Sequence, residues 1–252
     1  MTTRQEHFRA TFGNYDHMFE ELSVKGANMR DVAPLELDPW TSREVAALVD
    51  AVAEEVPESE GLVALAQAGR GGSDGGWGKE FLRHPFFLRI ILDLAAEGGS
   101  PAGTRADLIR QWVWRKLTRD LKTSRSTPVP VVDRNAFIEQ MEAIMTAVAG
   151  AMVKEVAGEY RMLDTIASEA VIQTCEQVFE TRIDLASAIS VTLLLPTSIR
   201  HRGSFPIRFS HRAFQEYFLA RHLVETRIDT AGYPHEVQAF GRELRCEDPS
   251  GI

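Results

Sequence analysis

A series of capped, amphipathic helix patterns constrains this chain more than any other feature. The first pattern begins at Thr41, which has Glu44 three residues later as a capping box, and apolar residues then recur at helical spacing. Pro85 is suited to start another helix, because its ring fixes a helical φ and the amide hydrogen that it lacks would be unpaired there. Gly98 and Gly99 are expected to end that helix.

Two longer helix patterns follow. Thr104 is expected to cap the first, and its apolar stripe consists of Leu108, Ile109, Trp112, Val113 and Leu117. Asp133 is expected to cap the second, and its apolar face consists of Phe137, Met141, Ile144, Met145, Val148 and Met152. The segment "RSTPVPVVD" between them contains two prolines, so we interpret it as a linker between domains.

The pattern then changes towards strands. A helix is expected from about Ile166 to Phe179, and "TLLLP" and "PIRF" then flank a loop centred on Gly203. Helices followed by such a hairpin indicate a winged-helix-like α/β domain. The sequence therefore predicts a mainly α protein, with a helical domain at 41–125, a winged-helix-like domain at 132–228 and a tail or a truncated sensor region at 229–252.

The stretch "IRFSHRAFQEYFLARHL" leads from the second of these strands into a helix rich in aromatic residues. Ser210 is expected to cap this helix, which places His211 in its first turn, between Arg208 and Arg212. Free backbone N–H groups and the positive end of the helix dipole favour an anion there, so a phosphate could bind. The alternative is a packed helix end in which His211 is only a hydrogen-bonded packing residue.

Charge and composition restrict the classes of function. The chain has 252 residues and a formal net charge of −8, which opposes a general nucleic-acid binder. Cys175 and Cys246 show neither metal-ligand spacing nor a disulfide framework, which indicates a reducing cytoplasm and no metal site. The N-terminus lacks a signal-peptide core, and Arg89 and Asp93 interrupt the longest apolar stretch, so neither secretion nor a membrane span is expected.

The glycine-dense segment "AGRGGSDGGWGKE" looks like a phosphate-binding loop but departs from that motif. Ser73 stands where the first glycine is required, and Glu80 stands where a serine or threonine would bind magnesium. We interpret the segment as a flexible loop. No nucleophile elbow and no His/Cys constellation appear elsewhere, so a hydrolase or transferase is the least favoured class.

Several motifs in order resemble the C-terminal half of a STAND-class regulatory NTPase of the NACHT type. The stretch "MTTRQEHF" resembles the end of the sensor strand, and "LELDPWTSREV" resembles the exit from the nucleotide-binding domain. The stretches "HPFFLRIILDLA" and "TRADLIRQWVWRKL" resemble the helical domain, and "FSHRAFQEYFLARHL" resembles the winged-helix signature. The resemblance implies that residues 1–40 are the remnant of an α/β nucleotide-binding domain.

The resemblance also implies a function. Arg4, Pro85 and His211 are the positions that match nucleotide contacts of the family, with His211 directed at the diphosphate of ADP. The Walker A and Walker B motifs would lie before Met1, so the chain is expected to be a fragment that neither binds ATP measurably nor catalyses its hydrolysis. The complete protein would bind ATP or ADP with magnesium, and could oligomerise on activation in a bacterial defence or signalling role. The missing N-terminal half would be the partner of this chain.

A second hypothesis is a DNA-binding winged helix. The interval from Leu185 to Gln215 contains no Asp or Glu, and its candidate phosphate contacts are Arg200, Arg202, Arg208 and Arg212. The acidic charge of the whole chain opposes this alternative.

Overall fold

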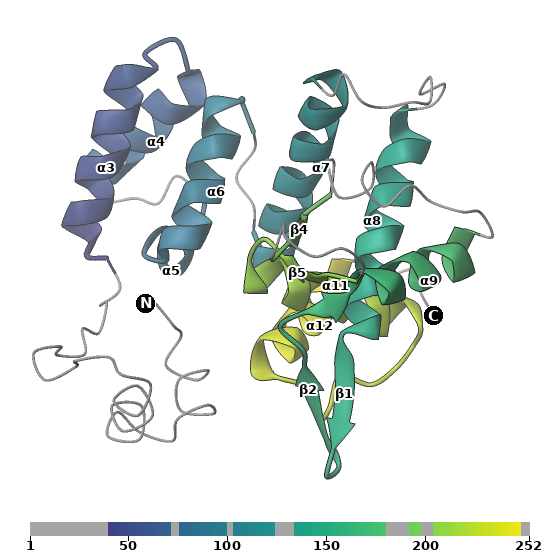
Figure 1. Cartoon of the computed structure of the whole chain (residues 1–252). Coiled ribbons are helices and arrows are strands. Elements are labelled where there is room, and N and C mark those ends of the chain that lie inside the picture. The colour runs from purple at the N-terminus through teal and green to yellow at the C-terminus, as the bar shows by residue number, and fades with distance from the viewer. Residues whose placement is uncertain are drawn as a thin grey trace, which may run out of the picture. The chain divides into compact units, whose positions relative to one another are not determined.

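The computed structural model describes residues 40–71, 76–99, 103–123, 134–179, 192–197 and 204–247. All of them belong to the compact unit Trp40–Ile252. This part of the chain is mainly helical and contains small antiparallel sheets (Figure 1). Arg4 and the expected sheet remnant belong to the unit Met1–Pro39, which lies outside the described residues.

The first helices are α3 (Ser42–Glu55) and α4 (Glu60–Arg70), which pack against each other. The capping box of α3 is confirmed, because the Thr41 hydroxyl accepts from the Glu44 amide and the Glu44 carboxylate accepts from the Thr41 amide at 2.7 Å. These hydrogen bonds from Thr41 lower the pKa of the Glu44 carboxyl. The sequence thus encodes the start of α3 locally.

Helices α5 (Lys79–Leu82) and α6 (Pro85–Ala96) follow. As predicted, Pro85 occupies the first position of α6, and Gly98 after its end has a φ of +71°, which favours glycine. Helix α6 approaches α4 closely, because a Cβ on Gly61 would lie 2.2 Å from the carbonyl oxygen of Ala95. Much of α6 is therefore core, and its residues Leu88, Ile90, Ile91, Leu94 and Ala95 are each about 1% exposed or less.

Helix α7 (Arg105–Thr123) begins after its predicted cap, since the Thr104 hydroxyl accepts from the Asp107 amide at 3.0 Å. Its apolar stripe is buried as expected, with Trp112 partly buried. Helix α8 (Arg134–Ala151) buries the predicted Met141 and Met145, and Met152 is buried directly after its end. Asp133 and the expected linker lie outside the described residues.

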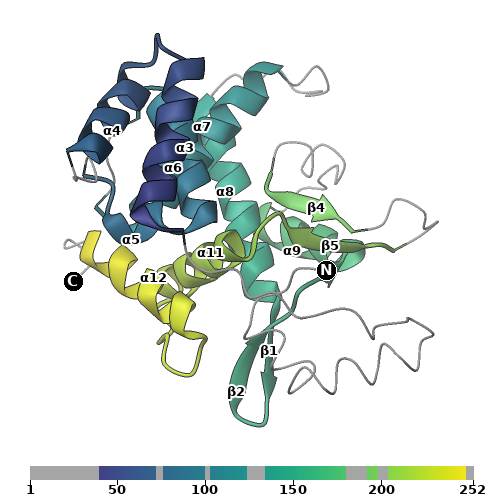
Figure 2. The ribbon, with the colours of Figure 1, turned by 90° about the vertical axis from the view of Figure 1, so that its left-hand side faces the viewer.

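A hairpin that the sequence analysis did not predict follows α8. Its strands β1 (Val153–Val156) and β2 (Glu159–Met162) pair antiparallel through a turn at Ala157 and Gly158, which both have positive φ. Figure 2 shows the hairpin extending away from the helices. The ring of Tyr160 stacks on Tyr233 with centroids 4.3 Å apart, which joins the hairpin to the segment after α11.

The second sheet contains the predicted hairpin. Strands β4 (Leu194–Pro196) and β5 (Pro206–Phe209) pair antiparallel, which confirms the two strand segments. The short strand β3 (Ile166–Ala167) pairs with the other edge of β5, giving the order β3-β5-β4. Helix α9 (Ser168–Phe179) therefore begins two residues later than predicted, because Ile166 and Ala167 are used in the sheet.

The last two helices are α11 (Arg212–Glu225) and α12 (His235–Glu247), which pack against each other. Helix α11 also packs on α8, and most of its residues are buried. Ser210 was predicted to cap α11, and that prediction is wrong. The Ser210 amide donates to the carbonyl of Leu193 at 2.8 Å, so Ser210 extends the sheet contact and His211 becomes the cap.

The sequence analysis did not predict helix α12. It buries Val237 and Phe240 and packs on α7 as well as α11. None of the helices in the described ranges combines the length and the apolar character that crossing a bilayer requires.

Candidate functional site

The start of α11 is built around the ring of His211. This residue is in extended conformation, with φ −148° and ψ 146°, and its Nδ1 accepts a hydrogen bond from the Ala213 amide at 3.1 Å. Its carbonyl accepts from the Phe214 amide at 3.1 Å. A ring nitrogen that accepts a hydrogen bond carries no proton, so the cap selects the neutral tautomer with its proton on Nε2.

Pro85 and His211, which are far apart in the sequence, meet at this point through Phe86. The rings of Phe86 and His211 stack with centroids 3.7 Å apart and an angle of 5° between their planes. Because Phe86 directly follows Pro85, the stack brings the first turn of α6 against the first turn of α11. The structure thus places the helix start that carries Pro85 in contact with the helix start that carries His211.

Two further rings extend this contact. Phe214 meets Phe86 edge to face with centroids 5.2 Å apart, and it stacks on Trp112 with centroids 5.1 Å apart. The indole Nε1 of Trp112 donates to the Asp93 carboxylate at 3.2 Å. We call Phe86, Trp112, His211 and Phe214 the aromatic cluster; it links α6, α7 and α11.

Two of the four basic residues of the alternative hypothesis, Arg208 and Arg212, lie in the described part of the chain. Arg208 is exposed on β5, whereas Arg212 forms ion pairs with Asp164 and Glu216, each at 3.2 Å. The carboxylates offset the charge that Arg212 would offer to a phosphate. Arg200 and Arg202 lie outside the described residues.

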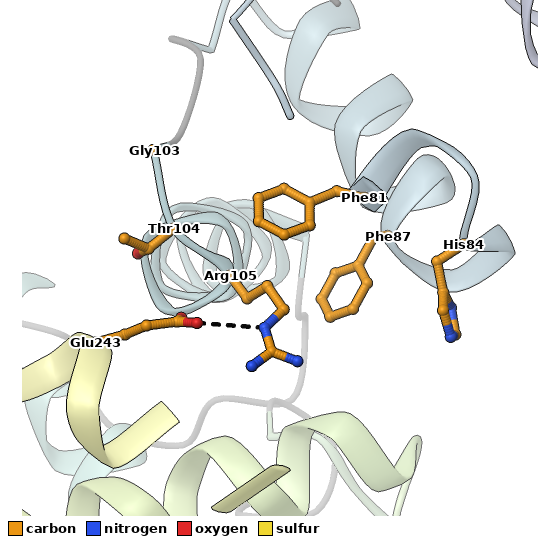
Figure 3. Close-up of a pocket in the computed structure, with 7 residues that line it drawn as sticks. All are labelled: Phe81, His84, Phe87, Gly103, Thr104, Arg105 and Glu243. Atoms are coloured by element: carbon orange, nitrogen blue, oxygen red, sulfur yellow. Dashed lines mark hydrogen bonds and ion pairs between the residues drawn. The ribbon is translucent and has the colours of Figure 1, made fainter. Parts of the chain in front are cut away.

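An open pocket of about 480 Å³ lies between the start of α6, the start of α7 and helix α12 (Figure 3). It is lined by Phe81, His84, Phe87, Gly103, Thr104, Arg105 and Glu243. The Glu243 carboxylate accepts from Arg105 Nε at 3.3 Å and from the Ala106 amide at 2.9 Å. A carboxylate of α12 therefore satisfies the positive start of α7.

The sequence analysis missed this pocket because it missed α12. The helical spacing of Val237, Phe240 and Leu244 was the signal that could have revealed the helix. No spacing within the sequence could have paired Glu243 with Arg105, because that contact depends on how α12 packs.

The part of the chain that the structure describes offers no candidate metal site. No group of three His, Cys, Asp or Glu side chains in the described ranges could hold a metal ion. Cys175 is buried, and burial together with the charge of Glu176 raises the pKa of its thiol to about 11. Such a thiol is protonated near neutral pH, so it is not an activated nucleophile.

Comparison of the chain with protein-family models, with curated proteins and with solved structures gives no match. The resemblance to NACHT-type NTPases therefore stays a prediction from the sequence motifs.

Proposed function

We propose that this chain supplies the helical and winged-helix-like parts of a nucleotide-regulated switch of the STAND class. The observation that carries the proposal is the stack of Phe86 on His211 at 3.7 Å. The resemblance assigns nucleotide contacts to Pro85 and His211, and these two positions lie in helix starts that touch each other. A single small ligand could contact both.

The second sheet supports the winged-helix-like part of the proposal. A winged-helix-like domain was expected from helices followed by a hairpin, and β4 and β5 follow α8 and α9 in that order. Strand β3 directly precedes α9 in the chain and pairs with β5 of the hairpin. The hairpin and α9 therefore form one structural unit. Helix α11 follows β5 through Ser210 and His211 alone.

His211 would hold the resting state through Nε2. Its Nδ1 is committed to the Ala213 amide, so the proton of the neutral ring is on Nε2 and could be donated to a phosphate oxygen. The Phe86 ring covers one face of the imidazole and fixes its plane. The remaining N–H groups at the start of α11 favour an anion at the same end of the helix.

The nucleotide and its magnesium would be held mainly by a domain with Walker motifs, which the family places before the segment resembling this chain. Residues of this chain would close over ADP and bias a two-state equilibrium, and exchange for ATP would release them. No catalytic step is assigned to this chain. The DNA-binding alternative is weakened by the ion pairs of Arg212.

The first test reads the coding frame upstream of Met1. We expect an apolar strand leading into a G-x-x-x-x-G-K-S/T motif, followed by a strand that ends in acidic residues. An upstream sequence without these motifs would remove the proposal that this chain serves an adjoining nucleotide domain in the same protein.

The second test compares His211→Ala with His211→Ser in the protein that carries the nucleotide domain. A serine can cap α11 but cannot reach the phosphate, so both variants should lose retained ADP and gain basal activity. Loss of one hydrogen bond to a charged group should shift the resting equilibrium by about tenfold to a hundredfold. Unchanged ADP retention at matched protein level would refute the role of His211.

The salt dependence of DNA affinity tests the DNA-binding alternative. If the chain bound DNA through four basic contacts, the logarithm of its affinity should fall with the logarithm of salt concentration with a slope of about three to four. The absence of a mobility shift at low salt would remove that alternative.

A further inference from the structure

We propose that the pocket at the start of α7 is a binding site for a small aromatic carboxylate, separate from the nucleotide contacts. Its wall carries the rings of Phe81 and Phe87, whose centroids lie 5.9 Å apart with an angle of 47° between their planes. Its volume of about 480 Å³ is in the range of small-molecule sites, which combine apolar walls with a few polar groups.

Arg105 is the group that would bind the carboxylate. Its side chain is about 25% exposed, and its guanidinium carbon lies 5.0 Å from the centre of the Phe240 ring. Its hydrogen bond to Glu243 uses Nε, so that bond does not commit the two terminal Nη groups (Figure 3). A planar guanidinium edge of this kind matches the two oxygens of a carboxylate.

Two apolar rings beside one guanidinium determine the class of ligand. The rings of Phe81 and Phe87 form an apolar surface on which the aromatic ring of a ligand can pack. The carboxylate of the same ligand can then face Arg105. Gly103 and Thr104, which precede the first turn of α7, line the same opening. An aliphatic acid or a neutral aromatic molecule would use only one of these two features.

Glu243 sets the affinity of the site. Its carboxylate already pairs with Arg105 and with the Ala106 amide, so it opposes a second anion at the same place. A bound carboxylate must therefore share Arg105 with Glu243 or displace it. Removing the charge of Glu243 while keeping its shape should strengthen binding, which a purely structural ion pair would not predict.

Benzoate is the probe for this site, with benzyl alcohol as its neutral counterpart. In NMR titrations of the whole chain, benzoate should shift the ring signals of Phe81 and Phe87 and the amide signals of residues 103–105, with a dissociation constant on the order of 1 mM. Benzyl alcohol should bind about tenfold more weakly, because it lacks the charge that Arg105 recognises.

Substitutions then assign the interaction to Arg105. Arg105→Gln should weaken benzoate binding about tenfold, and Glu243→Gln should strengthen it several-fold. Arg89→Gln on the exposed side of α6 is the matched control and should leave the affinity unchanged. If Arg105→Gln fails to fold, Arg105→Lys keeps the charge but loses the planar edge, and it should still weaken binding.

Equal affinity for benzoate and benzyl alcohol would overturn the proposal, as would a folded Arg105 variant that binds benzoate normally. Benzoate shifts confined to the start of α11 would also overturn it. The pocket includes neither Pro85 nor His211, so any of these results leaves the proposed switch untouched. Failure of the His211 variants would equally leave this pocket proposal standing.

Discussion

The first-turn amides of α7 and α11, which have no acceptor within their own helix, find hydrogen-bond acceptors in two different ways. The first turn of α7 receives a carboxylate from another helix, because Glu243 of α12 accepts from the Ala106 amide and from Arg105. The first turn of α11 is capped by its own neighbour, because His211 Nδ1 accepts from the Ala213 amide. The start of α7 thus adds a carboxylate from α12 to its local Thr104 cap, whereas the start of α11 is capped by the ring of His211.

The comparison shows how the short segment at the start of α6 can serve two sites. Phe86 stacks on His211 and so belongs to the start of α11, whereas the next residue, Phe87, lines the pocket at the start of α7. Consecutive positions in a helix point in different directions, so one turn can contact two neighbours. A ligand at the start of α7 and a ligand at the start of α11 would therefore both lie near the same turn of α6.

The largest expected effect comes from removing the ring that holds α11 against both neighbours. Phe214 is about 2% exposed and contacts Phe86 and Trp112. Phe214→Ala should lower the free energy of unfolding by about 3 to 5 kcal/mol, because it deletes a buried ring and leaves a cavity. Chemical denaturation measures this loss.

The control for that variant is Leu195→Ala in β4, because the Leu195 side chain is 41% exposed. It should change the free energy of unfolding by less than about 0.5 kcal/mol. A loss as small as this for Phe214→Ala would mean that the aromatic cluster does not hold α11 to α6 and α7.

A smaller effect is expected at the charged start of α7. Glu243→Ala leaves the Ala106 amide and Arg105 without this acceptor, so it should cost about 1 to 3 kcal/mol of unfolding free energy. The cost should shrink as salt is added, because part of it is electrostatic. Denaturation at low and at high salt measures both quantities.

The matched control is Asp50→Ala, which removes the more exposed pair between Asp50 and Arg70. Its cost should be about 0 to 1 kcal/mol, the usual range for surface ion pairs. If Glu243→Ala costs no more than Asp50→Ala, the carboxylate of α12 is not what stabilises the start of α7.

At the neutral start of α11, two substitutions separate the cap from the stack. His211→Ala removes both and should cost about 1 kcal/mol or more, whereas His211→Ser keeps a cap and removes only the contact with Phe86. The difference between the two variants measures the cap, and it should be insensitive to salt. A strong salt dependence of that difference would contradict the contrast with α7.

Local signals predicted much of this fold, and long-range contacts account for what was missed. The capping box at Thr41, the helix start at Pro85 and the cap at Thr104 are each confirmed, because their partners lie within a few residues in the sequence. Ser210 was predicted wrongly as a cap because the contact with the neighbouring strand continues through its amide, which donates to Leu193 just before β4, and the helix starts one residue later. The sequence cannot show that pairing.

In the candidate site, too, the local features were predictable from the sequence and the long-range contacts were not. The motif around His211 indicated a helix start able to hold an anion, and the structure places that residue at the cap. The stack with Phe86 could be found only from the packing of α6 on α11. The pocket required α12, whose apolar spacing is present in the sequence but whose Glu243 finds its partners only after folding.

At the opposite end of α11, a second histidine, His222, is held by packing and not by capping. The ring of His222 lies against α8, since a Cβ on Gly150 would come within 2.7 Å of it. Burial lowers the pKa of His222, and the charge of Glu225 only partly opposes this. Folding thus favours the neutral ring.

A lowered pKa in the folded state fixes the sign of the pH dependence. Below about pH 6.5, the ordinary pKa of histidine, the unfolded chain binds a proton that the folded chain resists, so stability should fall as the pH falls. His222→Gln should flatten that part of the curve, because it removes the imidazole whose pKa is lowered by burial. Denaturation between about pH 7.5 and pH 5.5 measures the difference. Equal slopes for the wild type and His222→Gln would show that the ring against Gly150 is as well solvated as a free histidine, and that the close approach of α8 and α11 does not depend on its neutral form.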